Sequence, residues 1–570
     1  MLLGAALGAA LLLAGSCHAL QSVNRVGRYL YGADDGKRFY VKGISYQEQG
    51  LITGNDPTSF PEPGDFIDPL ADSAGCQRDL PYLQQLGVNT IRVYSVNSSL
   101  NHDTCMSLLS KAGIYTIIDL SLPVNGSLDR VSPSWTTNLL NLYVETIEAF
   151  SKYDNVLAYN VGNEVAISNL TTVVGPFIKA AARDVKGTAY VALGLLLIKL
   201  GIFTLAYLKS KKFPQLVGYA SVDAPDIWRL PFAQFLSCDN EATSIDIYGL
   251  NNYEWCGDSN FQAAYVGTEN AFKTYNIPAY FSEFGCVKSP PRLWTEVQAL
   301  FGPQMIDVWS GGLAFSYFPA FGGFGMVNIS SDAKTVIVSD DFNRLKSQYA
   351  LVNFTDNPTK SNAGTTNYSQ CPAETPNFLA STKLPDTPNT NLCDCVLKSF
   401  SCLFTPQTPN YTYIVGDLLN YGCSQLGSLG GSCDTIASNG ETGVYGSLAE
   451  CDPTIKLSYV LSSYYEAYNR TPQSCNFSGN ATINPSAPPT RTDAVKAAQS
   501  CLTATPASTF TPSSVPLPQP PGASTSSSIS TSTRKGGATN NRVGLAGSEG
   551  IIGLGAFTLT SIIAGVWILL

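Results

Sequence analysis

The chain has 570 residues, of which 14% are charged and 44% are apolar, and its formal net charge is −9. This length predicts two or three domains, and the acidic balance excludes a nucleic-acid partner, which would need a basic face. Only two histidines are present, His18 and His102, which excludes histidine-rich metal sites and disfavours a Ser-His-Asp triad. We therefore expect no cofactor and no metal, and we expect carboxylates, hydroxyls and aromatic rings to carry the chemistry.

Residues 1–19 form an apolar run that ends in small residues. This pattern predicts a signal peptide, cleaved before Leu20. A first transmembrane helix is the alternative, but the run is short of the ~20 apolar residues that a span needs. Ten Asn-x-Ser/Thr sequons support a secretory route and are expected glycosylation sites. They lie at Asn97, Asn125, Asn169, Asn328, Asn353, Asn367, Asn410, Asn469, Asn476 and Asn480.

Residues 20–371 are expected to form one catalytic domain of the α/β class. Short β-rich runs alternate there with amphipathic stretches such as 76–86, 135–151 and 295–301. The runs are 39–46, 90–96, 115–121, 156–164, 216–221, 246–253, 278–285 and 311–318. Eight such alternations predict a (β/α)8 barrel. A doubly wound open sheet is the alternative, but it would have a glycine-rich phosphate turn after the first strand, and none is present.

Two of the expected strands carry a glutamate at their carboxyl ends, where the chemistry of such barrels is found. The run 156–164 ends in Asn163-Glu164, and the run 278–285 ends in Glu283-Phe284-Gly285. A retaining glycosidase needs two carboxyl groups ~5–5.5 Å apart, one as nucleophile and one as acid/base. Either glutamate alone would be interpreted as a solvated or paired carboxylate. Together they predict catalysis, with Asn163 holding the sugar 2-hydroxyl.

Residues 187–205 interrupt an amphipathic helix with a segment that is apolar on every face. The segment is too apolar for a surface loop. It is also a poor membrane span, since it is short, lies close to the barrel and contains Lys199. We interpret it as a retained intron, expected to leave the barrel as an outward excursion without a catalytic residue. The alternative is a real, apolar extension of a barrel helix.

Cysteine spacing predicts a second domain. Fourteen cysteines remain after the signal peptide, enough for seven disulfides in an oxidising compartment. Six are spread through the first domain, and eight are crowded into residues 392–503, a compact module expected to hold four internal bridges. Residues 372–391 are a linker, and secreted cysteines oxidise, which disfavours a zinc site. The crowded set is Cys393, Cys395, Cys402, Cys423, Cys433, Cys451, Cys475 and Cys501.

The carboxyl-terminal part predicts attachment to a membrane. Residues 504–540 are rich in Ser, Thr and Pro, which is typical of a solvated, O-glycosylated stalk. Residues 541–570 end in twenty apolar residues. A polar spacer precedes this apolar tail, and small residues precede the spacer. This pattern predicts a glycolipid-anchor signal that is removed on maturation, with attachment at Gly537 or Asn540. A retained tail-anchoring helix is the alternative.

The strand-end motifs resemble those of a known family. The stretches 39–47, 89–96, 159–165, 248–253, 281–286 and 308–318 look like the fungal β-1,3-glucanosyltransferases of glycoside hydrolase family 72. The resemblance runs from about residue 23 to residue 371. Residues 393–501 resemble the family 43 carbohydrate-binding module that some members carry. The order of signal, barrel, module, stalk and anchor signal also matches the family.

This resemblance implies an activity and a place. The expected enzyme cleaves an internal β-1,3 linkage with retention and transfers the fragment to the non-reducing end of a second β-1,3-glucan chain, which elongates cell-wall glucan. It would be held by a glycosylphosphatidylinositol (GPI) anchor at the outer face of the plasma membrane and in the cell wall. A β-1,3-glucan hydrolase and a non-catalytic glucan-binding wall protein are the alternatives; the second would be favoured if either glutamate were missing.

The resemblance also implies roles for single residues. Glu164 matches the acid/base and Glu283 the nucleophile. The implied disulfides of the barrel are Cys76–Cys105, Cys238–Cys371 and Cys256–Cys286. The implied sugar-contacting positions are Gln47, Tyr94, Asp119, Asn163, Tyr248 and Tyr317.

Overall fold

A computed structural model describes residues 19–50, 65–123, 126–199, 215–408 and 411–504. The expected signal peptide up to residue 18, the stalk beyond residue 504 and the anchor signal lie outside the described residues. The same is true of four single positions, Asn125, Asn410, Gly537 and Asn540.

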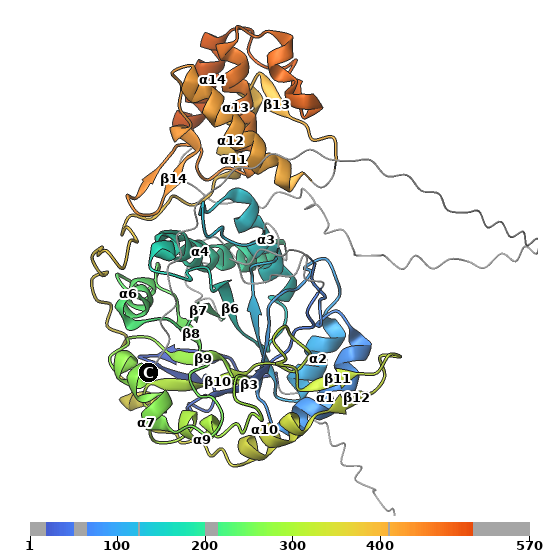
Figure 1. The fold of residues 1–570 in the computed structure, drawn as a ribbon, viewed down its shortest axis with the longest axis vertical. Helices are drawn as coiled ribbons and strands as arrows, with labels where there is room; N and C mark the ends of the chain where they lie inside the picture. The colour runs from blue at the N-terminus through green and yellow to red at the C-terminus, as the bar shows by residue number, and fades with distance from the viewer. Residues whose placement is uncertain (1–18, 51–64, 124–125, 200–214, 409–410, 505–570) are drawn as a thin grey trace, which may run out of the picture. The chain divides into compact units, whose positions relative to one another are not determined.

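Eight parallel strands close into a barrel, in the order β10-β3-β4-β5-β6-β7-β8-β9, and helices surround them (Figure 1). The (β/α)8 barrel is therefore confirmed, and each expected strand overlaps an observed one. One face of each strand lies against the barrel interior and the other against helices, so strands such as β9 are buried along their whole length. The strands are β3 (Val41–Ser45), β4 (Thr90–Val93), β5 (Tyr115–Asp119), β6 (Val156–Asn163), β7 (Leu216–Val222), β8 (Ile247–Asn251), β9 (Ala279–Phe284) and β10 (Trp309–Ala314).

The first barrel helix shows how the sequence sets the limits of these elements. Asp72 caps the amino end of α1 (Ser73–Leu86) by accepting a hydrogen bond from the Ala74 amide. Gly87 ends the helix because it adopts the left-handed conformation, with φ of 63°. The other helices of the domain are α2 (Asp103–Lys111), α3 (Thr137–Phe150), α4 (Gly175–Lys199), α6 (Asp226–Leu236), α7 (Phe261–Ala264), α8 (Val266–Phe272), α9 (Glu296–Leu300) and α10 (Asp340–Ala350).

The amino-terminal end of the barrel carries an antiparallel hairpin of β1 (Val23–Val26) and β2 (Tyr29–Gly32). The carboxyl ends of all eight strands meet at the opposite end, because the strands are parallel. Asp119 closes β5, Asn163 closes β6, Asn251 closes β8, and Glu283 lies one residue from the end of β9. The topology therefore gathers polar side chains from four strands at one end of the barrel.

Four helices and two short antiparallel strand pairs make up the cysteine-rich module. They are α11 (Thr390–Ser399), β13 (Cys402–Phe404), α12 (Thr412–Ser428), β14 (Ser438–Asn439), β15 (Val444–Tyr445), α13 (Pro453–Ala467), β16 (Ala481–Ile483) and α14 (Arg491–Ala504). The expected four internal bridges are present, as Cys393–Cys451, Cys395–Cys501, Cys402–Cys475 and Cys423–Cys433. A domain with so small a core depends on such cross-links.

The disulfides of the barrel are Cys76–Cys105, Cys238–Cys371 and Cys256–Cys286, as the resemblance implied. Of the described helices, none combines the length and the apolar character that a membrane span requires.

The apolar insert begins as a continuation of α4. The helix runs without a break from residue 175 to residue 199, so the insert does not leave the helix at Gly187 as a loop. Its remaining residues, 200–205, lie outside the described part of the chain. Contacts before the insert tie α4 to the barrel: Val185 is fully buried, and Lys186 donates a hydrogen bond to Asp246 at 2.8 Å.

We expect deletion of residues 187–205 to leave secretion and catalytic activity intact, because the helix packs on the barrel through residues before the insert, among them Phe177 and Ile178. The measurement is secretion yield and activity of the deletion variant beside the full chain. A variant that fails to fold, or mature message that contains these nineteen codons, would show that the segment is a genuine part of the protein.

Candidate active site

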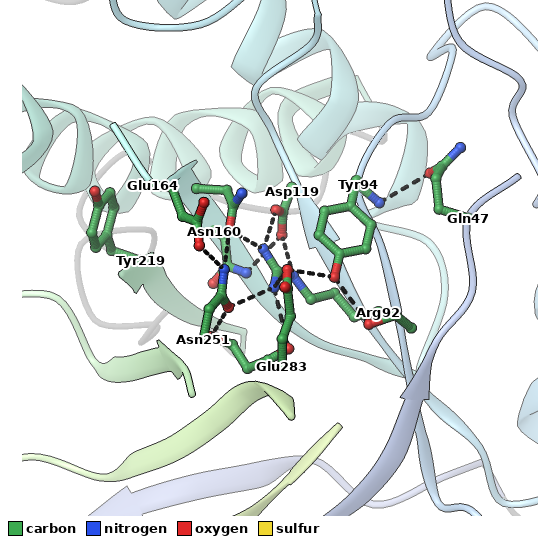
Figure 2. A network of polar contacts seen from close by, with 12 residues as sticks. Gln47, Arg92, Tyr94, Asp119, Asn160, Glu164, Tyr219, Asn251 and Glu283 are labelled. Atoms are coloured by element: carbon green, nitrogen blue, oxygen red, sulfur yellow. Dashed lines mark hydrogen bonds and ion pairs between the residues drawn. The ribbon is translucent and has the colours of Figure 1, made fainter. Parts of the chain in front are cut away.

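A buried arginine stands at the centre of the carboxyl end of the barrel (Figure 2). Arg92, on β4, is 0% exposed. Its Nη2 donates to Asp119 Oδ2 at 2.6 Å and to Asn163 Oδ1 at 2.9 Å. Its Nη1 lies 3.2 Å from Glu283 Oε1. A buried charge is tolerated only when it is paired and hydrogen-bonded, and Arg92 meets this condition with groups from other strands of the barrel.

Three hydrogen-bond donors converge on the carboxylate of Glu283. Arg92 and the hydroxyl of Tyr94, at 2.8 Å, reach Oε1, and the hydroxyl of Tyr253 reaches Oε2 at 2.7 Å. Ser45 lies 2.9 Å from the Tyr94 oxygen. Because Tyr94 uses its proton on Glu283, Ser45 must donate to Tyr94. The donors fix the orientation of the carboxylate and favour its charged form.

Burial, in contrast, disfavours the charged form of Glu283. It raises the pKa of the carboxyl to about 7, and the charge of Glu164 adds to the rise, while Arg92 and the two tyrosines oppose it. Two carboxyl groups that interact in this way titrate as a pair. The chemically useful form of the pair holds one proton, and the donors around Glu283 favour the negative charge on that side.

Glu164 follows β6 and is partly exposed. Its backbone has a φ of 47°, in the left-handed region that few residues other than glycine adopt. The backbone amide donates to the Ala220 carbonyl at 2.8 Å, and Arg130 donates to the Glu164 carbonyl at 3.2 Å. These contacts hold a strained conformation that directs the side chain, which is a recurring property of functional positions.

Asn251 connects the two glutamates. Its Nδ2 donates to Glu164 Oε1 at 2.8 Å and to Asn163 Oδ1 at 3.1 Å. Its Oδ1 accepts from Ser282 at 2.7 Å. Since Arg92 also binds Asn163, the amide oxygen of Asn163 is fully used, and its nitrogen has no hydrogen-bond partner among the described residues. That nitrogen is available to a ligand hydroxyl.

Asp119 completes the network below the site. It is 1% exposed and binds Arg92, and Asn160 donates to its Oδ1 at 2.6 Å. Gly218 makes room for Asn160, because a Cβ there would lie 2.5 Å from the Asn160 amide oxygen. Asp119 therefore orients Arg92 and has no surface to offer a sugar, which corrects its expected role as a contact residue.

Two more of the expected sugar contacts are wrong. Tyr248 is 0% exposed, and its ring packs against Phe272 and Tyr275 from the helix side of the barrel. Tyr317 is also 0% exposed and lies against Tyr46 and Phe318. Both tyrosines contribute to packing and not to the mouth of the site.

Gln47 and Tyr94 lie where a ligand contact needs them, and both remain predictions. Gln47 is partly exposed, its Oε1 accepts from the amides of Tyr94 and Ser95, and its Nε2 donates to the Ile67 carbonyl at 2.6 Å. Gln47 thereby fixes the end of β4, from which Tyr94 reaches Glu283 (Figure 2).

Sequence reasoning did not assign roles to Arg92, Asn251 and Tyr253, which hold the glutamates. The available signal was their position, since all three lie at the carboxyl ends of expected strands.

The described residues contain no group of three or more His, Cys, Asp and Glu that could hold a metal ion.

The chain is similar to known proteins in sequence. The glucanosyltransferase family of glycoside hydrolases, family 72, matches residues 13–353, and the X8 domain matches residues 400–482. The 1,3-beta-glucanosyltransferase gas1 of Schizosaccharomyces pombe is 37% identical over 461 residues, which cover 80% of this chain and 78% of that protein. The 1,3-beta-glucanosyltransferase GAS2 of Saccharomyces cerevisiae is 35% identical over 458 residues, covering 78% and 76%.

Solved structures agree with these relatives. A mutant of Saccharomyces cerevisiae Gas2p in complex with laminaritetraose and laminaripentaose superposes with a TM-score of 0.71 at 32% sequence identity. The match covers 84% of this chain and 98% of that one. The same protein in complex with laminaritriose and laminaritetraose gives a TM-score of 0.70 at 34% identity, covering 82% and 98%.

The raised pKa of Glu283 predicts a stability effect. The carboxyl has a pKa of 4.5 when exposed and of about 7 in the folded protein. It therefore does not change the free energy of unfolding below pH 4.5, and it lowers this free energy as the pH rises from 4.5 through 7. The shift corresponds to ~3 kcal/mol as an upper bound. We expect Glu283→Gln to melt at a higher temperature than the wild type at pH 8, and at the same temperature at pH 4.

Thermal melts of both proteins at the two pH values make the comparison, with the exposed Glu374→Gln as the matched control. The control is expected to follow the wild type at both values. Equal melting temperatures for wild type and Glu283→Gln at pH 8 would contradict the assigned burial cost.

Proposed function

Because the chain belongs to the glucanosyltransferase family of glycoside hydrolases, family 72, we propose that it is a retaining 1,3-β-glucanosyltransferase. It cleaves an internal linkage of one β-1,3-glucan chain and transfers the fragment to the non-reducing end of another. The observation that carries this proposal is the pair Glu164 and Glu283 at the carboxyl end of one barrel, linked through Asn251 and Arg92. The laminari-oligosaccharides bound to Gas2p structures support the substrate class.

The first step breaks the glycosidic bond. An oxygen of ionised Glu283 attacks the anomeric carbon, while the carboxyl of Glu164 gives its proton to the departing glycosidic oxygen. The fragment is then held as an ester on Glu283, and the rest of the donor chain leaves with the proton. Arg92, Tyr94 and Tyr253 hold the attacking carboxylate in one orientation, which reduces the reorganisation needed at the transition state. The free amide nitrogen of Asn163 donates to the sugar 2-hydroxyl.

The second step transfers the fragment to the acceptor and restores the ionised carboxylate of Glu283. Glu164, now ionised, takes a proton from the acceptor hydroxyl, whose oxygen attacks the anomeric carbon and releases Glu283. Asn251 donates to Glu164 Oε1 and stabilises its ionised form in this step. Two successive displacements at one carbon retain the β configuration. Water in place of the acceptor sugar would give hydrolysis with the same residues.

Product analysis on one reduced laminari-oligosaccharide tests the proposal. Products longer than the donor demonstrate transfer. Products that are only shorter demonstrate hydrolysis and would overturn the transferase. An unchanged substrate would favour a glucan-binding wall protein.

The module and the chain ends complete the proposal. The match to the X8 domain supports a glucan-binding role for the module. Tyr464 and Tyr468, whose rings lie 4.6 Å apart, offer an aromatic surface, and Tyr468 is 41% exposed. Aromatic faces of this kind suit sugar rings. The expected signal peptide and glycolipid-anchor signal support a location at the outer face of the plasma membrane and in the cell wall, next to its glucan substrates.

The two glutamates are expected to respond differently to an activated donor. Glu283→Gln should abolish turnover of every donor, because no ester can form. Glu164→Gln should lose ~10²–10⁴-fold on laminari-oligosaccharides, the usual contribution of a general acid, and should recover on an aryl glycoside whose leaving group needs no proton. Initial rates with both donors make the measurement.

Glu374→Gln, an exposed carboxylate, is the control and should keep wild-type rates on both donors. Activity of Glu283→Gln on the aryl donor would contradict its role as nucleophile. Failure of the aryl donor to restore activity to Glu164→Gln would contradict its role as acid.

A further inference from the structure

A cavity of about 320 Å³ lies far along the barrel from the glutamates. It is formed by α6, α8 and the segment 363–369, and Arg28 from the turn of the β1–β2 hairpin closes it. Asn276, which lines it, precedes β9, so the cavity is at the amino-terminal end of the barrel. Its walls combine amides and hydroxyls with apolar groups. They include Leu230, Gln234, Thr274 and Tyr275.

A complete N-glycosylation sequon forms part of the wall. Asn367 and Ser369, the two defining residues of Asn367-Tyr368-Ser369, both line the cavity, and both are exposed. The Asn367 side-chain amide makes no hydrogen bond with the described residues. Its nitrogen is therefore free to carry a sugar. In contrast, the Asn353 amide of a second exposed sequon in this domain donates to the Leu351 carbonyl, and Asn353 does not line the cavity.

The backbone of this sequon is held in place from several sides. Asn276 donates to the Asn367 carbonyl at 3.1 Å, and the Asp239 amide donates to the Ser369 carbonyl at 2.9 Å. Between them, Arg25 donates to the Tyr368 hydroxyl at 2.8 Å. Two residues beyond Ser369, the disulfide Cys238–Cys371 joins the chain to the loop that follows α6. A sugar on Asn367 would therefore start from a fixed point at the edge of the cavity.

We propose that Asn367 is glycosylated and that its first N-acetylglucosamine occupies this cavity as a structural part of the barrel. The amide nitrogen of Asn367 replaces the diphosphate of a lipid-linked oligosaccharide at the anomeric carbon and gives up one proton. The cavity is at the small end of the ~300–1,000 Å³ range of ligand sites, which suits a monosaccharide. The acetamido methyl and ring carbons lie against Leu230 and Tyr275, and the polar groups of the sugar bind Gln234 and Asn276.

This docked sugar would connect four segments that meet at the amino-terminal end of the barrel. They are the β1–β2 hairpin, α6, α8 and the segment that follows α10. The partly exposed side chain of Leu230 would be covered, and water would leave a polar cavity whose groups find partners on the sugar. The gain is in folded stability, and no residue of the catalytic network takes part.

The test uses full-length chain secreted from a eukaryotic host, with glycan occupancy measured by mass spectrometry. Asn367→Gln and Ser369→Ala, which both remove the sequon, are expected to lower Tm by about 2–4 °C or more. Ser369→Thr keeps the sequon and should keep the wild-type Tm. Asn353→Gln is the matched control and should also melt like the wild type.

Enzymatic trimming separates the first sugar from the rest of the glycan. An endoglycosidase that leaves one N-acetylglucosamine should preserve Tm, and an amidase should remove the Asn367 glycan from folded protein more slowly than the Asn353 glycan. The proposal is overturned if Asn367 is unoccupied, if Asn367→Gln and Ser369→Ala melt like Asn353→Gln, if Ser369→Thr melts like Ser369→Ala, or if the amidase removes both glycans at equal rates.

Discussion

The buried charge of Arg92 is the constraint on which the rest of the site depends. A guanidinium with no exposed surface must find all its partners inside the protein, and here they come from the ends of β5, β6, β8 and β9. A slip of one residue in any of these strands would turn the partner side chain to the opposite face. Removing the Asp119 carboxylate would cost ~3–5 kcal/mol, because Arg92 would stay buried without its closest counter-charge. The same contacts that align the carboxyl pair thus also specify the register of the barrel.

The site combines stable packing with local strain. The strands that carry it are buried on both faces, and their outward side chains pack against the surrounding helices. Against this rigid background, Glu164 keeps a left-handed backbone and Glu283 keeps an ionisable group in a dry setting. Both features cost stability, and both would serve the proposed reaction, since one directs a side chain and the other lets two carboxyls share a proton.

Much of this was predictable from sequence, for identifiable reasons. Eight alternations of strand and helix define the barrel, and the parallel topology then requires that Glu164 and Glu283 lie at the same end. Tyr248 was wrongly expected to contact the sugar, because side chains alternate along a strand and only every second residue faces the barrel interior. Asn251 faces the site, and Tyr248, three residues earlier on β8, faces the helices. The partners of Arg92 were not predictable, because they depend on which strand ends converge, and that follows from barrel closure.

The bridge between Cys395 and Cys501 has a mechanical consequence. It spans 106 residues and joins α11, where the module begins, to α14, where it ends. Tension applied to the chain beyond residue 504 would enter at Cys501 and pass through one covalent bond to Cys395. The helices and strand pairs between these two points would carry almost none of the load. The module is therefore built so that a pull along the polypeptide does not unfold it.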